Sequence, residues 1–217
     1  MTVYREKFHE ELNSLISECI NLGKECQIRL AGTVEILVAE NIDAARKVVR
    51  KDAEINRMEA DINAHAINLI TTQAPVATDL RTIISCIKIA DNLERIGDNI
   101  SNVAEVRKRI KITNERTLLR FKTMERLASL MLEDVYTAFK EEDMDLLDEI
   151  ILRDQDIDAV FVQITTSDIF EESDAFLTGQ IQLTAKYLER IGDHIKSIAE
   201  HIYYIHTGDP YEKHKSE

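Results

Sequence analysis

Apolar residues recur every three or four positions through almost the whole chain. In one stretch they stand at Ile89, Leu93, Ile96, Ile100 and Val103, with steps of four and three in alternation. This spacing places them on one face of an α-helix that packs against neighbouring helices. The 217 residues include only two prolines and six glycines, which is too few for the many turns of a strand-rich fold. The pattern therefore predicts an all-α protein.

The breaks in this pattern divide the chain into six long helical segments, in two sets of three. The first set comprises a helix from about Glu6 to Ala39, a helix from Asp43 to about Thr72, and a helix from the segment QAPVATDLR to about Arg109. The second set comprises a helix that follows the link 111–114 and ends at about Phe139, a helix from Asp145 to about Phe170, and a helix that ends at about His206. We expect Asp43 and Asp145 to be the N-caps of the middle helices.

The two sets of helices are copies of one unit. The six residues LERIGD occur at 93–98 and again at 188–193, and residues 89–105 share ten of seventeen positions with residues 184–200. The middle helices also match, at an offset of 102 residues instead of 95. A duplicated three-helix unit with a short deletion before the last helix explains both offsets. The predicted units are residues 1–111 and 112–217.

The charge of the chain narrows the classes of function. The net charge is −13, and residues 112–217 carry almost all of it. Such a surface repels phosphate backbones, so we expect no nucleic-acid partner. The chain contains no run of about 18 uncharged apolar residues, the length that a membrane-spanning helix needs. The three cysteines lack the spacing of metal ligands, so we expect them to be small buried residues in a soluble, cytoplasmic protein.

The last helix of each unit carries acidic residues on the side away from its apolar stripe. Glu94 and Asp98 in the first copy, and Glu189 and Asp193 in the second, are like charges four residues apart. Such a pair costs about 0.2–0.5 kcal/mol on a helix. The ordinary explanation of an acidic stripe is a solvated face. Because both copies keep the repulsion, we expect a bound cation.

The middle helices carry acids that could complete such a site. Asp52 in the first unit, and Asp154 and Asp158 in the second, flank the apolar stripe of their helix rather than opposing it. This position brings them towards the acids of the neighbouring helix. Oxygen ligands without cysteine suit the hard cations Mg²⁺, Mn²⁺, Ca²⁺ or iron.

These features together resemble the PhoU family of bacterial phosphate-signalling regulators. The resemblance rests on the duplicated ERIGD helix, the segment QAPVATDLR, and the paired acidic motif in which aspartate follows glutamate or aspartate after three residues. It extends from the first helix to about His206. LERIGD alone would be a modest signal, but its occurrence twice in register makes the resemblance specific.

The resemblance implies two three-helix bundles related by pseudo-twofold symmetry, often in a homodimer, with metal clusters bound by the acidic motifs. Iron is the metal that the family suggests most, with Mg, Mn, Ca or Zn as alternatives. Carried onto the matching positions, the candidate metal ligands are Asp52, Glu94 and Asp98 in the first unit, and Asp154, Asp158, Glu189 and Asp193 in the second.

The resemblance also implies a role. Members of the family act in the cytoplasm as adaptors between a phosphate ABC transporter, through its ATPase, and a sensor histidine kinase. They keep phosphate-starvation genes off when phosphate is plentiful. Such an adaptor is peripheral to the membrane, through its partners only.

The sequence departs from the family motif at three positions. Asn56 replaces the second acid of the first middle helix, Lys186 stands where the first copy has Asp91, and Ser197 stands where it has Asn102. Because Lys186 would partly neutralise the second acidic stripe, two equivalent metal clusters are not expected.

Two other functions stay open at this point. One is a metal-free helical interaction scaffold, which differs from the first hypothesis only in whether the acids bind anything. The other is a carboxylate-bridged di-metal enzyme, which needs glutamate and histidine three residues apart on two helices. Only Glu6 and His9 have that spacing. The chain also lacks a nucleophile with its base and a glycine-rich phosphate loop, so we expect no enzyme.

Overall fold

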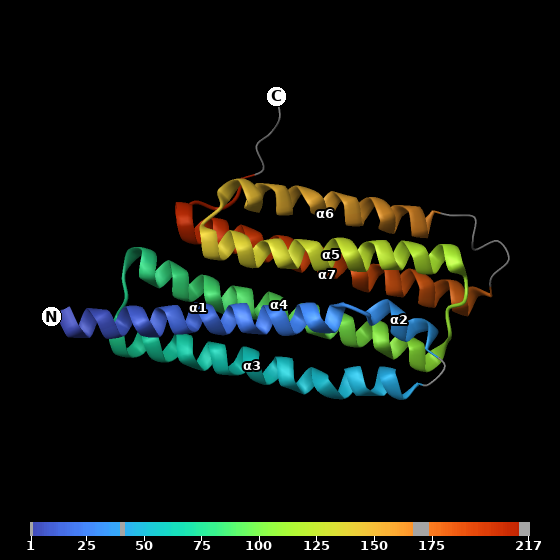
Figure 1. Cartoon of the computed structure of the whole chain (residues 1–217), viewed down its shortest axis with the longest axis horizontal. Coiled ribbons are helices and arrows are strands. Elements are labelled where there is room, and N and C mark those ends of the chain that lie inside the picture. The colour runs from blue at the N-terminus through green and yellow to red at the C-terminus, as the bar shows by residue number, and fades with distance from the viewer. Residues whose placement is uncertain (1, 40–41, 167–173, 213–217) are drawn as a thin grey trace, which may run out of the picture.

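The computed structural model describes residues 2–39, 42–166 and 174–212, and this part of the chain is helical with no strand (Figure 1). The helices are α1 (Thr2–Leu30), α2 (Thr33–Val38), α3 (Asp43–Gln73), α4 (Ala77–Arg109), α5 (Glu115–Glu141), α6 (Met144–Thr165) and α7 (Ala175–Thr207). Six of them are long, and α2 is a short continuation of α1. The predicted all-α fold with six long helices is confirmed.

The helices form two three-helix bundles that lie side by side. Helices α1 to α4 make the first bundle and α5 to α7 the second, and α3 and α6 lie at the outer edges (Figure 1). The main contact between the bundles is α4 against α7, and α1 and α2 also touch α5. None of the described helices is long and apolar enough to cross a membrane. The boundary at residue 111 between two separate domains stays a prediction.

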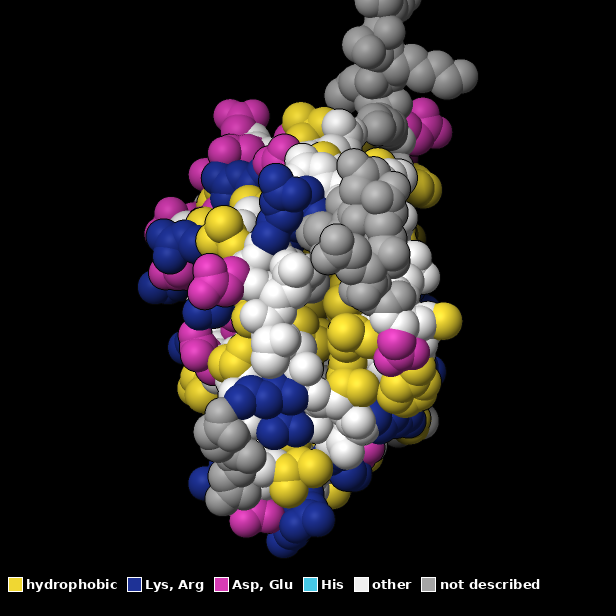
Figure 2. Space-filling model, turned by 90° about the vertical axis from the view of Figure 1, so that its right-hand side faces the viewer, with side chains coloured by type: hydrophobic (Ala, Val, Ile, Leu, Met, Phe, Trp, Pro, Cys, Tyr) yellow, Lys and Arg dark blue, Asp and Glu magenta, His cyan; other side chains and the backbone are white. Residues whose placement is uncertain are grey.

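The end of the molecule at which α5 and α7 begin carries exposed hydrophobic side chains among charged ones. Figure 2 shows this face, with hydrophobic groups between clusters of Lys and Arg and of Asp and Glu. The helix ends that lie here include the exposed residues Leu119, Val162 and Phe176. This surface is therefore mixed in character rather than uniformly acidic.

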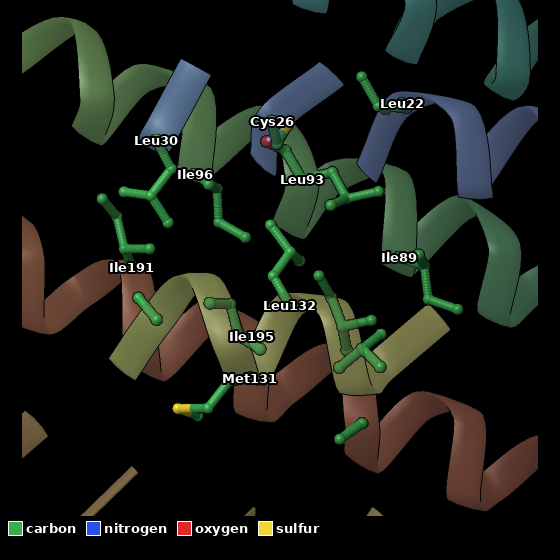
Figure 3. Close-up of a cluster of buried hydrophobic side chains, with 14 of the residues drawn as sticks. Leu22, Cys26, Leu30, Ile89, Leu93, Ile96, Met131, Leu132, Ile191 and Ile195 are labelled. Atoms are coloured by element: carbon green, nitrogen blue, oxygen red, sulfur yellow. Dashed lines mark hydrogen bonds between the residues drawn. The ribbon is translucent and has the colours of Figure 1, made fainter. Parts of the chain in front are cut away.

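The apolar stripe of the repeated helix is the centre of the core, as predicted. Leu93 and Ile96 of α4 and Ile191 and Ile195 of α7 are buried together with Leu132 of α5 (Figure 3). One hydrophobic cluster runs through both bundles. The three cysteines are buried and free, also as predicted.

The first predicted helix is wrong in one respect, because it is interrupted at Gly32. This residue has φ 88°, a left-handed conformation that ends α1 and lets α2 begin at Thr33. The hydroxyl of Thr33 donates to the carbonyl oxygen of Arg29 at 2.7 Å. The apolar pattern continues across the break, since Leu30, Val34 and Leu37 are all buried. Periodicity alone therefore hides the interruption.

The predicted caps of the middle helices are also wrong. Helix α6 is capped by Asp143, whose Oδ1 accepts from the backbone N–H of Leu146 at 3.0 Å, and Asp145 lies inside its first turn. Asp43 is the first residue of α3 rather than its N-cap. Helix α6 ends at Thr165, and the predicted end at Phe170 lies outside the described residues.

The glycine of LERIGD lets the middle helix of each bundle approach the last helix closely. A Cβ atom at Gly97 would lie 2.7 Å from Ile55 Cδ1 of α3. A Cβ atom at Gly192 would lie 2.9 Å from both Ile157 Cδ1 and Asp154 Oδ1 of α6. A Cβ atom at either position would force the opposite side chain to shift, whereas glycine fits without any change. The duplicated motif thus contains the contact that sets the spacing of α3 on α4 and of α6 on α7.

We predict that Gly97→Ala destabilises the protein by about 1–3 kcal/mol, because the added methyl group overlaps the buried Ile55 side chain. The control is Gly179→Ala, since a Cβ atom added at that position of α7 would meet no other described part of the chain within 4 Å beyond its own turn of helix. There the higher helix propensity of alanine should stabilise the protein by about 0.5–1 kcal/mol. Urea unfolding followed by circular dichroism measures both values. A gain in stability at both glycines would rule out the close contact.

Candidate functional site

The predicted ligand residues lie on two pairs of packed helices. The first acidic cluster, on α3 and α4, comprises Asp52, Glu94 and Asp98. The second acidic cluster, on α6 and α7, comprises Asp154, Asp158, Glu189 and Asp193. Both helix pairs are held close by the glycine contacts described above. Each cluster therefore draws on the middle and the last helix of its bundle.

In the first acidic cluster, Asp98 of α4 interacts with Asp52 of α3 and with Glu94 of its own helix. Burial raises the pKa of Glu94, and the neighbouring Asp98 raises it further. Burial likewise raises the pKa of Asp98, with an added contribution from Asp52. Arg95 lies 3.6 Å from both Glu94 and Asp98, but its side chain is half exposed. These acids are thus partly buried and mutually repulsive, unlike an ordinary solvated face.

One carboxylate of the first acidic cluster has a hydrogen-bond donor. Asp52 Oδ1 accepts from the hydroxyl of Ser101, on α4, at 2.8 Å. This bond crosses the seam between α3 and α4 and fixes the direction in which the Asp52 side chain points. A hydroxyl donor supplies no positive charge, so the negative charge of the first acidic cluster is not reduced by it.

The second acidic cluster is centred on a buried carboxylate. The side chain of Asp154 is only 3% exposed, and the ammonium group of Lys196 lies 3.3 Å from its Oδ2. The pKa of Asp154 is raised to about 6, chiefly by burial and also by the neighbouring Asp158 and Asp193, although Lys196 opposes the change. The other oxygen, Oδ1, is buried and has no hydrogen-bond partner among the described residues.

Glu189 is tied to a lysine instead of to the other acids. Its side chain is 12% exposed, and the Nζ atom of Lys186 lies 2.6 Å from its carboxylate. The same ammonium group lies 5.5 Å from the centre of the Phe161 ring. The expectation that Lys186 partly neutralises the second acidic stripe is confirmed by this contact.

Within residues 2–39, 42–166 and 174–212, no three acidic, histidine or cysteine side chains are arranged so that they could hold a metal ion. The assignment of the seven acids as metal ligands therefore stays a prediction. Helix periodicity identified the acids but missed Lys196 and Ser101. The signal for both was present in the comparison of the two copies, in which lysine and serine stand at matching positions.

A separate pocket lies between α1 and α3. It has a volume of about 490 Å³ and is lined by Glu18, Asn21, Met58, Asp61, Ile62 and His65. His65 contacts Glu18 through Nδ1 at 3.0 Å and Glu11 through Nε2 at 3.2 Å. These bonds tie α3 to α1, and the pocket includes no residue of either acidic cluster.

A comparison with known families agrees with the resemblance that the motifs indicate. The model of the PhoU domain matches this chain twice, at residues 20–106 and 121–202. The chain belongs to the PhoU family. This is a family of regulatory accessory proteins and not of enzymes, and the two matches correspond to the two copies found in the sequence.

Relatives from several bacteria match this PhoU-family chain along most of its length. The phosphate-specific transport system accessory protein PhoU homolog of Clostridium acetobutylicum is 30% identical over 210 residues, which cover 94% of this chain and 96% of that protein. The protein of the same name from Zymomonas mobilis is 31% identical over 209 residues, which cover 93% of this chain and 87% of that protein.

Two solved structures have the same fold. PhoU from Pseudomonas aeruginosa superposes with a TM-score of 0.85 at 27% identity, over 93% of this chain and all of that one. The phosphate transport system regulatory protein PhoU from Streptococcus pneumoniae superposes with a TM-score of 0.86 at 24% identity, over 95% of this chain and all of that one. The arrangement of two repeated helical bundles is therefore shared with these proteins.

We predict that Asp154→Asn stabilises the protein at pH 8 and that the gain disappears as the pH falls. The pKa of Asp154 is raised to about 6 in the folded state, compared with about 3.9 in an unfolded chain. The folded protein thus binds more protons between these values, so this group costs stability as the pH rises through 6. Asparagine removes a cost of roughly 1–3 kcal/mol above pH 7 and almost none below pH 4.

Urea unfolding of both proteins from pH 4 to pH 8 measures this difference. The control is Asp156→Asn, because Asp156 is exposed on the same helix and is not among the groups that shift the pKa of Asp154, so its removal should change stability little at any pH. A difference between Asp154→Asn and the native chain that is the same at pH 5 and pH 8 would contradict the assignment of the buried charge.

Proposed function

We propose that this chain is a cytoplasmic regulator of phosphate uptake, an adaptor between a phosphate ABC transporter and a sensor histidine kinase that represses the phosphate-starvation response. The observation that supports this function is the match to accessory proteins of phosphate-specific transport systems along more than nine-tenths of the chain. The transporter ATPase and the kinase are the expected partners, and a homodimer is the expected form of the adaptor.

The surface of the molecule suits an adaptor. Residues 112–217 carry almost all of the net charge of −13, and a partner with a basic patch would associate with them faster and more specifically at low salt. The end shown in Figure 2 also exposes apolar side chains between charged groups. Leu119 and Phe176, near the starts of α5 and α7, are among the exposed apolar residues of the molecule. Apolar centres with a charged rim are typical of surfaces that bind other proteins.

We also propose that the first acidic cluster binds a divalent metal ion. Asp52, Glu94 and Asp98 would hold it through carboxylate oxygens, the donors that Mg²⁺, Mn²⁺, Ca²⁺ and iron prefer. The raised pKa values of Glu94 and Asp98 come partly from neighbouring carboxylates, a repulsion that a cation would relieve. When bound, the ion would supply positive charge at the seam between α3 and α4.

The second candidate function is the same adaptor without metal. It is favoured by the absence, in the described part of the chain, of three ligand side chains in metal-binding geometry. In this case the acids of α3 and α4 would act only as a charged surface for partners. The two candidates differ in a single measurable property, the metal content of the purified protein.

A reporter strain tests the regulatory function. Deleting the gene should switch on a phosphate-starvation promoter in medium with ample phosphate, and the native chain should switch it off again. A chain with Gly97→Ala controls for fold stability, since its effect should scale with the amount of folded protein. A promoter that stays off in the deletion strain would refute the proposed repression.

Elemental analysis of protein purified without chelator tests the metal. We expect Glu94→Gln to weaken metal binding by about tenfold or more, because the variant loses a carboxylate from the first acidic cluster. Glu189→Gln is the matched control, since this carboxylate is already paired with Lys186 and should leave the metal content unchanged. Equal metal content in the native chain and in Glu94→Gln would favour the metal-free adaptor.

A further inference from the structure

The two acidic clusters differ in the group that stands beside the carboxylate of the middle helix. Asp52 and Asp154 occupy matching positions, 102 residues apart, and Ser101 and Lys196 also match, 95 residues apart. Ser101 donates its hydroxyl to Asp52 at 2.8 Å, whereas Lys196 brings an ammonium group within 3.3 Å of Asp154. The same place in the fold thus holds a neutral donor in one bundle and a positive charge in the other.

A second lysine makes the same kind of difference. Lys186 of α7 matches Asp91 of α4. Its ammonium group lies 2.6 Å from the carboxylate of Glu189. Asp154 and Glu189, the two well-buried acids of the second acidic cluster, therefore each have a lysine as partner. In the first bundle, the positions that match these two lysines carry a serine and an aspartate.

We propose that Lys196 and Lys186 are built-in cations that occupy the second acidic cluster in place of a metal ion, so that divalent cations are confined to the first bundle. A carboxylate as deeply buried as that of Asp154 strongly destabilises the folded protein when it is ionised, unless a positive charge lies nearby. Lys196 provides this charge from a neighbouring helix at every metal concentration. The stability of the second bundle is then independent of metal. Only the confinement of metal to the first bundle rests on the proposed function.

The surroundings of the Lys196 ammonium group explain why a divalent cation could bind there if the lysine were removed. Lys196 reaches only Oδ2 of Asp154, and Oδ1 is buried without a hydrogen-bond partner in the part of the chain that the structure describes. Asp158 and Asp193 lie near enough to raise the pKa of Asp154. Removing the ammonium group would thus leave a buried carboxylate with two further acids nearby. As they stand, these side chains are not arranged to hold a metal ion, but their oxygens are the donors that a hard divalent cation prefers.

Lys196→Ser tests the proposal, because it copies into the second bundle the residue that the first bundle has. In EDTA we expect the variant to lose about 3–8 °C of Tm, since the buried Asp154 loses its partner. Added Mn²⁺ should restore most of this loss, and equilibrium dialysis should detect about one more Mn²⁺ per chain than the native protein binds. Lys196→Met keeps the apolar stem of the lysine and removes only its charge, so it should show the same Mn²⁺ response without a loss of packing.

The double variant Lys196→Ser, Asp154→Asn is the matched control. It lacks both the ammonium group and the buried carboxylate, so it should show neither the extra Mn²⁺ nor the recovery of Tm. Because every comparison is made against the native chain, the result does not depend on whether the first acidic cluster binds metal. The reciprocal variant Ser101→Lys addresses that question separately and should lower any Mn²⁺ binding of the first bundle.

Two results would overturn the proposal. The first is an unchanged Mn²⁺ response in both Lys196→Ser and Lys196→Met, which would mean that the lysine does not occupy a cation site. The second is a fall in the bound Mn²⁺ of the native background on Glu189→Gln, which would mean that the second acidic cluster already binds metal beside its lysines.

Discussion

The contact between a glycine of the last helix and an isoleucine of the middle helix determines how each bundle is built. At Gly97 and Ile55, and at Gly192 and Ile157, the two helices approach so closely that a methyl group would overlap the opposite side chain. This approach buries the apolar stripes of α4 and α7 in one core. It also brings the acids of α3 against those of α4, and the acids of α6 against those of α7. A sequence motif that looks like a charged signature is therefore first a packing element.

Close packing of this kind makes the carboxylates costly. A buried carboxylate without a nearby positive charge or donor is far less stable than one in water, and the raised pKa of Asp154 reflects this cost. The two bundles respond differently to the same constraint. In the first, Asp52 receives a hydroxyl and its neighbours stay partly exposed; in the second, Asp154 receives the ammonium group of Lys196. Duplication kept the geometry of the seam while the charge beside it changed.

Much of this fold could be predicted from the sequence, because helix periodicity and duplication are both visible in a single chain. The predictions that were wrong concern helix breaks and helix caps, which depend on local backbone geometry. The apolar pattern runs unbroken past Gly32, so the left-handed residue there could not be seen from it. Asp143 and Asp145 are equally suitable caps by residue type, and only the backbone distinguishes them. The contact between Lys196 and Asp154 depends on how α6 and α7 pack against each other, and the periodicity of a single helix gives no information about this packing. The comparison of the two copies did give a signal, because Ser101 in the first copy is matched by Lys196 in the second.

The placement of the first acidic cluster has a consequence for communication between the bundles. Glu94 and Asp98 lie on α4, and α4 is the helix that packs most extensively against α7. Asn92 of α4 and His194 of α7 are in hydrogen-bond contact across this interface, at 3.0 Å. A ligand changes the balance between two conformations only by binding one of them more tightly. Because Lys196 and Lys186 already pair with Asp154 of α6 and Glu189 of α7, a cation would act on the first bundle alone. Any shift of α4 against α3 would then have to be accommodated at the interface of α4 with the second bundle.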